Sequence, residues 1–74
     1  MHFNENLKHY RKKRGFSQQH LAGLTGIPQT TISEWERGVG EATFSRTCLL
    51  AEALRIPVAF FSISPERKTS HEQA

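Results

Sequence analysis

The stretch SQQHLAGLTGIPQTTISEWER, residues 17–37, decides the fold of this chain. Ser17 is a good N-cap, because its side-chain oxygen can accept a hydrogen bond from a free N–H in the first turn of a helix. A helix of about two turns is therefore predicted from residue 18 to the glycine at position 26. Pro28 suits the start of the next helix, since its missing N–H would have no partner there, and that helix is predicted to end at Arg37, before Gly38.

The apolar residues of this stretch predict that the two helices pack against each other. The positions that would close a small core between them are Leu21, Ile27, Ile32 and Trp35. Ala22 is small enough for a close approach of the helices, and Gly26 can take the positive φ that a sharp turn requires. Two short helices joined by three or four residues fit the geometry of a helix-turn-helix.

The flanking segments predict further helices. Phe3, Leu7 and Tyr10 recur at i, i+4 and i+7, so residues 3–14 should form an amphipathic helix. Thr43 can cap a fourth helix that runs to about residue 55, and Pro57 opens a fifth helix of about one turn. We found no strand pattern. The expected fold is all-α, with one domain over residues 1–63 and a disordered tail over residues 64–74, which has almost nothing to bury.

The fourth helix has an expected inner face. On a helical projection this face consists of Phe44, Thr47, Cys48, Ala51 and Leu54. Leu50 falls at the margin of the face and Leu49 on the opposite side. Phe44 is therefore predicted to be buried and Leu49 to be exposed.

Composition excludes several classes of function. The chain has 74 residues, too few for a deep ligand pocket, and no apolar run approaching the ~18 residues of a membrane span. It should be cytoplasmic, with no small-molecule ligand, cofactor or metal. The histidines show no metal-ligand spacing, the single cysteine fits a small core residue, and no Asp is present to complete a Ser-His-Asp set. We expect no enzyme.

The positive charges are concentrated. The net charge is +3, and five of the ten Lys and Arg residues lie between Lys8 and Arg14. Such a cluster can attract a polyanion, although a solvated helix face looks the same.

Five stretches together resemble a known family. They are LKHYRKKRGFSQQ (7–19), LAGLTGIPQTTIS (21–33), WERG (35–38), LAEAL (50–54) and IPVAFF (56–61). Residues 7–61 are thus similar to the phage-repressor and Cro-like helix-turn-helix family, often called XRE-like. The resemblance implies a compact five-helix, lambda-repressor-like bundle, a third helix in the major groove of double-stranded DNA, binding as a homodimer to a two-fold operator, and no cofactor.

The chain departs from that family at four places. His20 stands where Glu or Gln often completes a capping box with Ser17. Pro28 replaces a frequent Ser or Thr cap, and residues 39–42 lack the usual Lys and Arg. Arg55 occupies a usual glycine position.

Helical periodicity assigns roles within residues 28–37. The outward residues, expected to read bases, are Gln29, Thr30, Ser33 and Glu34. Gln29 can bind adenine through N6 and N7, Thr30 can contact a thymine methyl, and Glu34 can accept from cytosine N4. Ordinary polar surface residues would show the same pattern. Contacts to the DNA backbone are expected from Gln18, by the resemblance, and from Thr31, Lys8 and Lys13.

Glu36 faces inward beside Ile32 on the same projection. An unpaired carboxylate there would be costly, so it needs a cation. Arg11 lies one turn after Leu7 on the inner side of the first helix. Arg11 and Glu36 are therefore predicted to form a structural ion pair, and the resemblance points to the same pair.

Our interpretation is a sequence-specific transcriptional regulator, a repressor rather than an activator because a second domain is not apparent. Apolar residues beyond the core predict the homodimer interface: Leu49, Ile56, Phe60 and Phe61. An antitoxin or the controller of a restriction-modification system would look alike. A protein-interaction module that has lost DNA binding is the alternative from another class.

Overall fold

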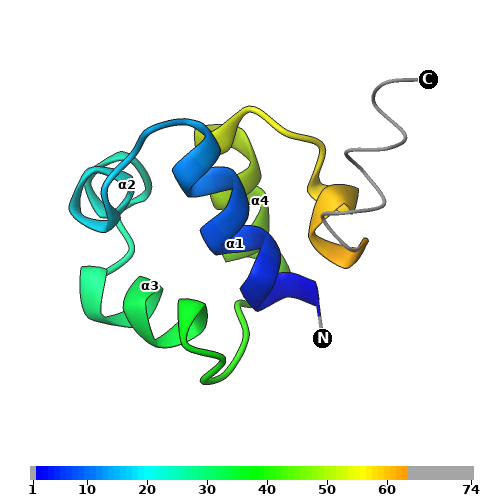
Figure 1. Cartoon of the computed structure of the whole chain (residues 1–74), viewed down its shortest axis with the longest axis horizontal. Coiled ribbons are helices and arrows are strands. Elements are labelled where there is room, and N and C mark those ends of the chain that lie inside the picture. The colour runs from blue at the N-terminus through cyan, green and yellow to red at the C-terminus, as the bar shows by residue number, and fades with distance from the viewer. Residues whose placement is uncertain (1, 64–74) are drawn as a thin grey trace.

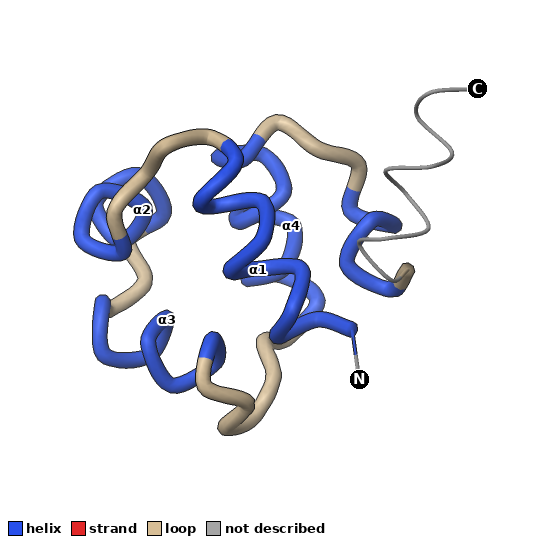
Figure 2. Tube along the Cα trace, viewed as in Figure 1, coloured by secondary structure: helices blue, strands red, loops and turns tan. Residues whose placement is uncertain are grey.

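The computed structural model describes residues 2–63, and the predicted disordered tail lies outside these residues. The described part is helical, without strands (Figure 1 and Figure 2). Its elements are α1 (His2–Lys13), α2 (Gln18–Thr25), α3 (Gln29–Glu36), α4 (Phe44–Leu54) and the short 3-10 helix η1 (Val58–Ser62). The all-α prediction is confirmed, and the fifth element is a 3-10 helix.

Helix α1 lies across the middle of the bundle and contacts α3, α4 and η1, while α2 packs on α3 and α4 (Figure 1). One apolar core joins them. It consists of Phe3, Leu7, Tyr10, Leu21, Ile27, Ile32, Trp35, Leu50, Ala51, Leu54 and Phe61. None of the helices in residues 2–63 is long and apolar enough to cross a membrane.

The turn between α2 and α3 forms as its residues predict. The Ser17 hydroxyl accepts a hydrogen bond from the His20 N–H at 2.9 Å and so caps α2 without help from the His20 side chain. Gly26 ends the helix at φ 78°, in the left-handed region that glycine enters without steric cost. Pro28 precedes α3 and supplies no side-chain cap. These ends set the angle between α2 and α3.

Helix α4 differs from its expected inner face. Leu50 is fully buried in the core, whereas Phe44 is 73% exposed. Phe44 occupies the first turn of α4, directly after its N-cap Thr43, and this turn extends beyond the core. Leu49 is exposed, as predicted.

Phe61 is a correction to the predicted dimer interface. Its side chain is only 5% exposed, and its ring lies 5.4 Å from the ring of Phe3. Phe61 belongs to the domain's own core because η1 folds back onto α1, so it offers no surface to a second copy.

Candidate nucleic-acid interface

The outer face of α3 brings the predicted base-reading residues together. Ile32 and Trp35 point into the core, while Gln29, Thr30 and Glu34 are exposed and Ser33 is half-buried. A shallow hollow crosses this face toward the start of α2. It is lined by Gln18, Gln29, Thr30, Ser33, Glu34 and Arg37. We call Gln29, Thr30, Ser33 and Glu34 the reading face.

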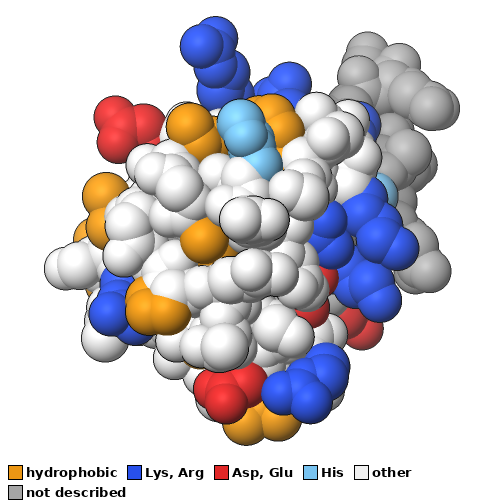
Figure 3. All heavy atoms as spheres, turned by 90° about the vertical axis from the view of Figure 1, so that its left-hand side faces the viewer, with side chains coloured by type: hydrophobic (Ala, Val, Ile, Leu, Met, Phe, Trp, Pro, Cys, Tyr) orange, Lys and Arg blue, Asp and Glu red, His pale blue; other side chains and the backbone are white. Residues whose placement is uncertain are grey.

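Figure 3 views the molecule from the side that carries α2 and α3. Uncharged surface covers most of the centre of this side, and Lys and Arg side chains gather toward its edges. Uncharged polar groups in the middle can meet base edges, whereas cations at the margin can meet phosphates.

An ion pair joins α1 to the end of α3. Arg11 Nε lies 2.6 Å from Glu36 Oε2, and Arg11 Nη2 lies 2.9 Å from Glu36 Oε1. Arg11 Nη1 also donates to the Phe16 carbonyl at 2.7 Å. The Glu36 side chain is only 4% exposed. The predicted structural pair is present, and it leaves Arg11 occupied on the inside of the bundle.

Glu36 is held in its charged form. Its burial alone would raise the pKa of the carboxyl, but hydrogen bonds from Arg11 and Gln18 and the charges of Arg11 and Lys8 outweigh this and leave the pKa below its ordinary value. The same hydrogen bond raises the pKa of the Arg11 guanidinium. The pair is therefore ionised at neutral pH.

Gln18 stands between the ion pair and the reading face. Its Nε2 donates to Glu36 Oε1 at 3.1 Å, and its side chain also lines the hollow of the reading face. Gln18 was predicted to contact the DNA backbone, and in the structure its side chain is hydrogen-bonded to Glu36 at the end of α3. Thr31, on α3, is half-buried and does not line that hollow.

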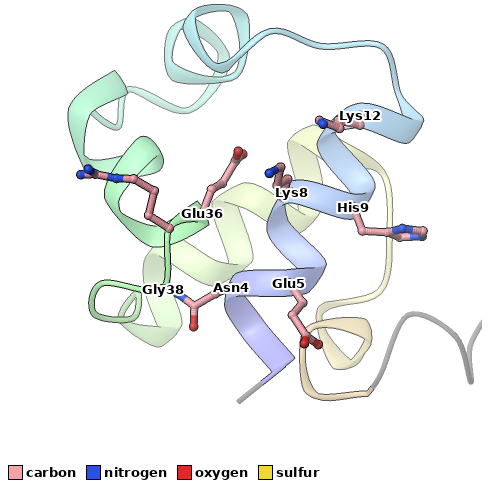
Figure 4. A pocket seen from close by; sticks show the side chains of 8 residues that line it. Asn4, Glu5, Lys8, His9, Lys12, Glu36 and Gly38 are labelled. Atoms are coloured by element: carbon pink, nitrogen blue, oxygen red, sulfur yellow. The ribbon is translucent and has the colours of Figure 1, made fainter.

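Arg37 is a residue that sequence reasoning missed. It is exposed and borders two hollows, one shared with the reading face and one between α1 and α3. Figure 4 shows the second hollow, where Lys8 points toward the side of Glu36 and His9 points away from it. Lys12 lies on the same side of α1 and lines this hollow too. We call Lys8, Lys12 and Arg37 the cation strip.

Lys13 is not part of that strip. Its Nζ lies 5.9 Å from the centre of the Tyr10 ring, in a hollow lined also by Phe60 and Arg55 on the η1 side of the bundle. Lys13 follows Lys8 by five positions, about 140° around a helix with 3.6 residues per turn. Both lysines were predicted to contact the DNA backbone, but they line different hollows on different sides of α1. Lys12 follows Lys8 by four positions, a spacing that predicts a shared face.

No group of three or more His, Cys or Glu side chains that could hold a metal ion occurs within the part of the chain that the structure describes. Cys48 is a half-buried free thiol.

Comparison with known proteins agrees with this architecture. Residues 7–61 match the helix-turn-helix family HTH_3. The chain is 32% identical over 73 residues to the HTH-type transcriptional activator BcrR of Enterococcus faecalis and 37% identical over 54 residues to the control protein C.SmaI of Serratia marcescens. The fold matches that of an HTH_3 family transcriptional regulator from Vibrio cholerae with a TM-score of 0.76 and 30% sequence identity.

The matches differ in how much of each protein they cover. The BcrR alignment takes in 99% of this chain and 32% of BcrR, and the C.SmaI alignment takes in 73% of this chain and 64% of the control protein. The Vibrio cholerae structure covers 81% of this chain, which spans 34% of that protein. Because the family match extends over most of the described residues, the chain belongs to the HTH_3 family of helix-turn-helix proteins.

Proposed function

We propose that this chain is a transcriptional regulator that binds double-stranded DNA by placing α3 in the major groove. The observation that carries the proposal is the single hollow shared by the reading face, Gln18 and Arg37. A helix with its side chains is about 10–12 Å across, and the major groove is about 12 Å wide, so α3 can enter it with its exposed residues against the base edges.

Each residue of the reading face has a matching base edge. Gln29 begins α3 and can bind both N6 and N7 of one adenine. Thr30 can present its methyl group to thymine, and Glu34 can accept a hydrogen bond from cytosine N4. Ser33 is half-buried and reaches less far. Sequence discrimination should therefore come mainly from the exposed N-terminal part of α3.

The cation strip would hold the phosphates beside the groove. Arg37 closes α3 and borders the hollow that contains Lys8 and Lys12. Phosphate contacts of this kind position a protein on DNA without reading its sequence, and each one adds to the salt dependence of binding. Gln18 adds a polar contact from the first residue of α2. Lys13 is excluded from the proposal because it lies on the η1 side.

A homodimer on a two-fold operator is the second element of the proposal. Leu49 is 43% exposed on α4, and Ile56 and Phe60 are half-buried, so these three residues leave apolar surface for a partner copy. A two-fold dimer would address half-sites one helical turn apart, about 34–36 Å. We retain repression as the direction of control, because a dimer seated on an operator within a promoter excludes the polymerase without any further contact.

Control of a restriction-modification system is a second candidate. The similarity to C.SmaI favours it, since that match has the higher identity of the two relatives. The genes beside the coding sequence distinguish the two: a neighbouring endonuclease and methyltransferase pair supports the controller.

Selection of bound duplexes from a random pool tests the function. We expect one enriched two-fold sequence and a cognate affinity at least about 10³-fold above that for random DNA. Enrichment of no sequence, together with affinity for random duplex that does not fall between 50 and 200 mM salt, would contradict DNA binding.

Two lysines form a matched pair that tests which side of α1 faces the DNA. Lys8→Ala should flatten the dependence of log affinity on log salt by about one unit, whereas Lys13→Ala should leave the slope unchanged. The reverse result would mean that DNA lies against the η1 side of α1 rather than against α3.

A further inference from the structure

The segment that carries Arg37 is held at both ends by one side chain from another helix. Asn4 Nδ2 donates to the Trp35 carbonyl at 2.6 Å and to the Gly40 carbonyl at 3.0 Å. A side-chain amide has two N–H donors, so these two bonds use the full capacity of the Asn4 nitrogen. Figure 4 shows Asn4 pointing from α1 to the turn at Gly38.

The segment between these two carbonyls is short and turns sharply. Gly38 and Gly40 both take positive φ, at 91° and 72°. The Gly38 N–H bonds to the Trp35 carbonyl at 3.0 Å, and the Val39 N–H bonds to the Glu34 carbonyl at 2.8 Å. Beyond these local bonds, the Asn4 amide ties the turn to the body of the bundle.

Two further links between α1 and α3 lie at the same end of α3. The Arg11 and Glu36 pair is one, and the edge-to-face contact of Phe3 with Trp35, with ring centres 5.6 Å apart, is another. These two links act before Arg37 in the chain. Asn4 also holds the chain after Arg37, by its hydrogen bond to the Gly40 carbonyl.

We infer that Asn4 is a positioning residue for DNA binding, which acts by fixing the segment from Trp35 to Gly40 and thereby aiming Arg37 at a phosphate. The inference rests on the proposed function. A guanidinium on a mobile turn must lose more conformational freedom when it binds, so a fixed turn makes the same phosphate contact stronger.

Asn6 provides a matched control. It is also an asparagine of α1, and its Nδ2 donates to a backbone carbonyl, that of Ile63, at 2.8 Å. This bond lies at the η1 end of the chain, away from α3. Asn4→Ala and Asn6→Ala should both lower stability, but only Asn4→Ala should loosen the turn that carries Arg37.

The first measurement needs no DNA. In Asn4→Ala, amide hydrogen exchange of Gly38 and Val39, whose N–H groups close the turn, should accelerate about tenfold or more relative to exchange of the more stable core amides. In Asn6→Ala, the ratio of these two exchange rates should stay at its wild-type value. Unchanged exchange at these two amides in folded Asn4→Ala would overturn the inference, whether or not the protein binds DNA.

The second measurement is a double-mutant cycle on DNA at a temperature where every variant is folded. Asn4→Ala should weaken cognate and random duplex alike, by about fivefold to tenfold, and should flatten the salt slope. The double variant Asn4→Ala/Arg37→Ala should bind as Arg37→Ala does, because the positioning has no remaining target.

Additive losses in the double variant would show that Asn4 acts by some route other than Arg37 and would overturn the inference. A loss of equal size in Asn6→Ala would show a general effect of stability, with the same consequence. Absence of DNA binding in the wild-type chain contradicts the proposed function instead. Hydrogen exchange then still tests whether Asn4 fixes the turn.

Discussion

Arg11 and Glu36 form a two-pronged ion pair, with Nε to Oε2 at 2.6 Å and Nη2 to Oε1 at 2.9 Å, between the last turn of α1 and the last residue of α3. The pair sits at the end of the proposed reading helix. A parallel fork of charge-assisted hydrogen bonds fixes orientation as well as distance. It therefore ties the axis of α3 to that of α1.

Removal of one partner should be costly. Glu36→Ala leaves the Arg11 guanidinium in a mostly buried place without its carboxylate, and we expect a loss of roughly 3–5 kcal/mol in the free energy of unfolding. The double variant Arg11→Met/Glu36→Ala removes the unpaired charge and should recover part of this loss. Urea denaturation of the two variants checks this, and a double variant no more stable than the single one would argue against pairing as the cause.

The depressed pKa of Glu36 predicts a pH dependence of stability. Below the ordinary glutamate pKa, about 4.3, the unfolded chain takes up a proton at this position before the folded chain does, so the free energy of unfolding falls as the pH falls toward the folded pKa. Glu36→Gln should be less stable at pH 7 and show a shallower loss between pH 5 and 3. Parallel curves for the two proteins, measured by chemical denaturation, would contradict a lowered pKa.

Gln29 should determine a base. Gln29→Ala should lower affinity for the selected operator by about 1–3 kcal/mol and leave affinity for random duplex nearly unchanged, because the lost bonds reach only base atoms. Gln19→Ala is the matched control, since Gln19 is exposed on α2 and does not line the hollow of the reading face. If Gln29→Ala weakens both duplexes equally, Gln29 contacts the backbone and α3 is rotated from the proposed orientation.

Arg55 is the one non-glycine residue with positive φ among residues 2–63, at φ 58° and ψ 49° after α4. Glycine reaches this conformation without the clash of a Cβ atom, so Arg55→Gly should raise the free energy of unfolding by about 0.5–1 kcal/mol. Arg46→Gly within the right-handed α4 should instead lose about 1 kcal/mol. Thermal unfolding of both variants measures the difference, and equal destabilisation by the two glycines would refute the argument.

Leu49 provides the test of the homodimer. Leu49→Lys should make the chain monomeric in sedimentation equilibrium without lowering its stability appreciably, because the side chain is already 43% exposed. Val39→Lys is the control, since Val39 is 55% exposed in the turn after α3 and does not line the hollow that Leu49 shares with Leu24. A monomeric wild-type chain, both free and on DNA, would remove the dimer from the proposal.

The local structure around the helix-turn-helix could be predicted from the sequence, because each element there depends on residues within one or two turns. A Ser17 hydroxyl, a glycine at position 26 and a proline at position 28 act on their own backbone. The inward direction of Glu36 also follows from helical periodicity, and burial of a carboxylate requires a cation. These arguments concern one helix at a time.

The tertiary structure decided what depends on how the helices meet. The first turn of α4 extends beyond the core, so Phe44 is exposed, whereas Leu50 further along the helix is buried. The 3-10 helix η1 folds back, so Phe61 enters the core. The packing of α1 on α3 places Lys12 and Arg37 along one hollow and brings the Asn4 amide to the Gly40 carbonyl. Periodicity assigns a side chain to a face of its own helix, but which neighbour covers that face, and how far along it, is set by distances between elements remote in sequence.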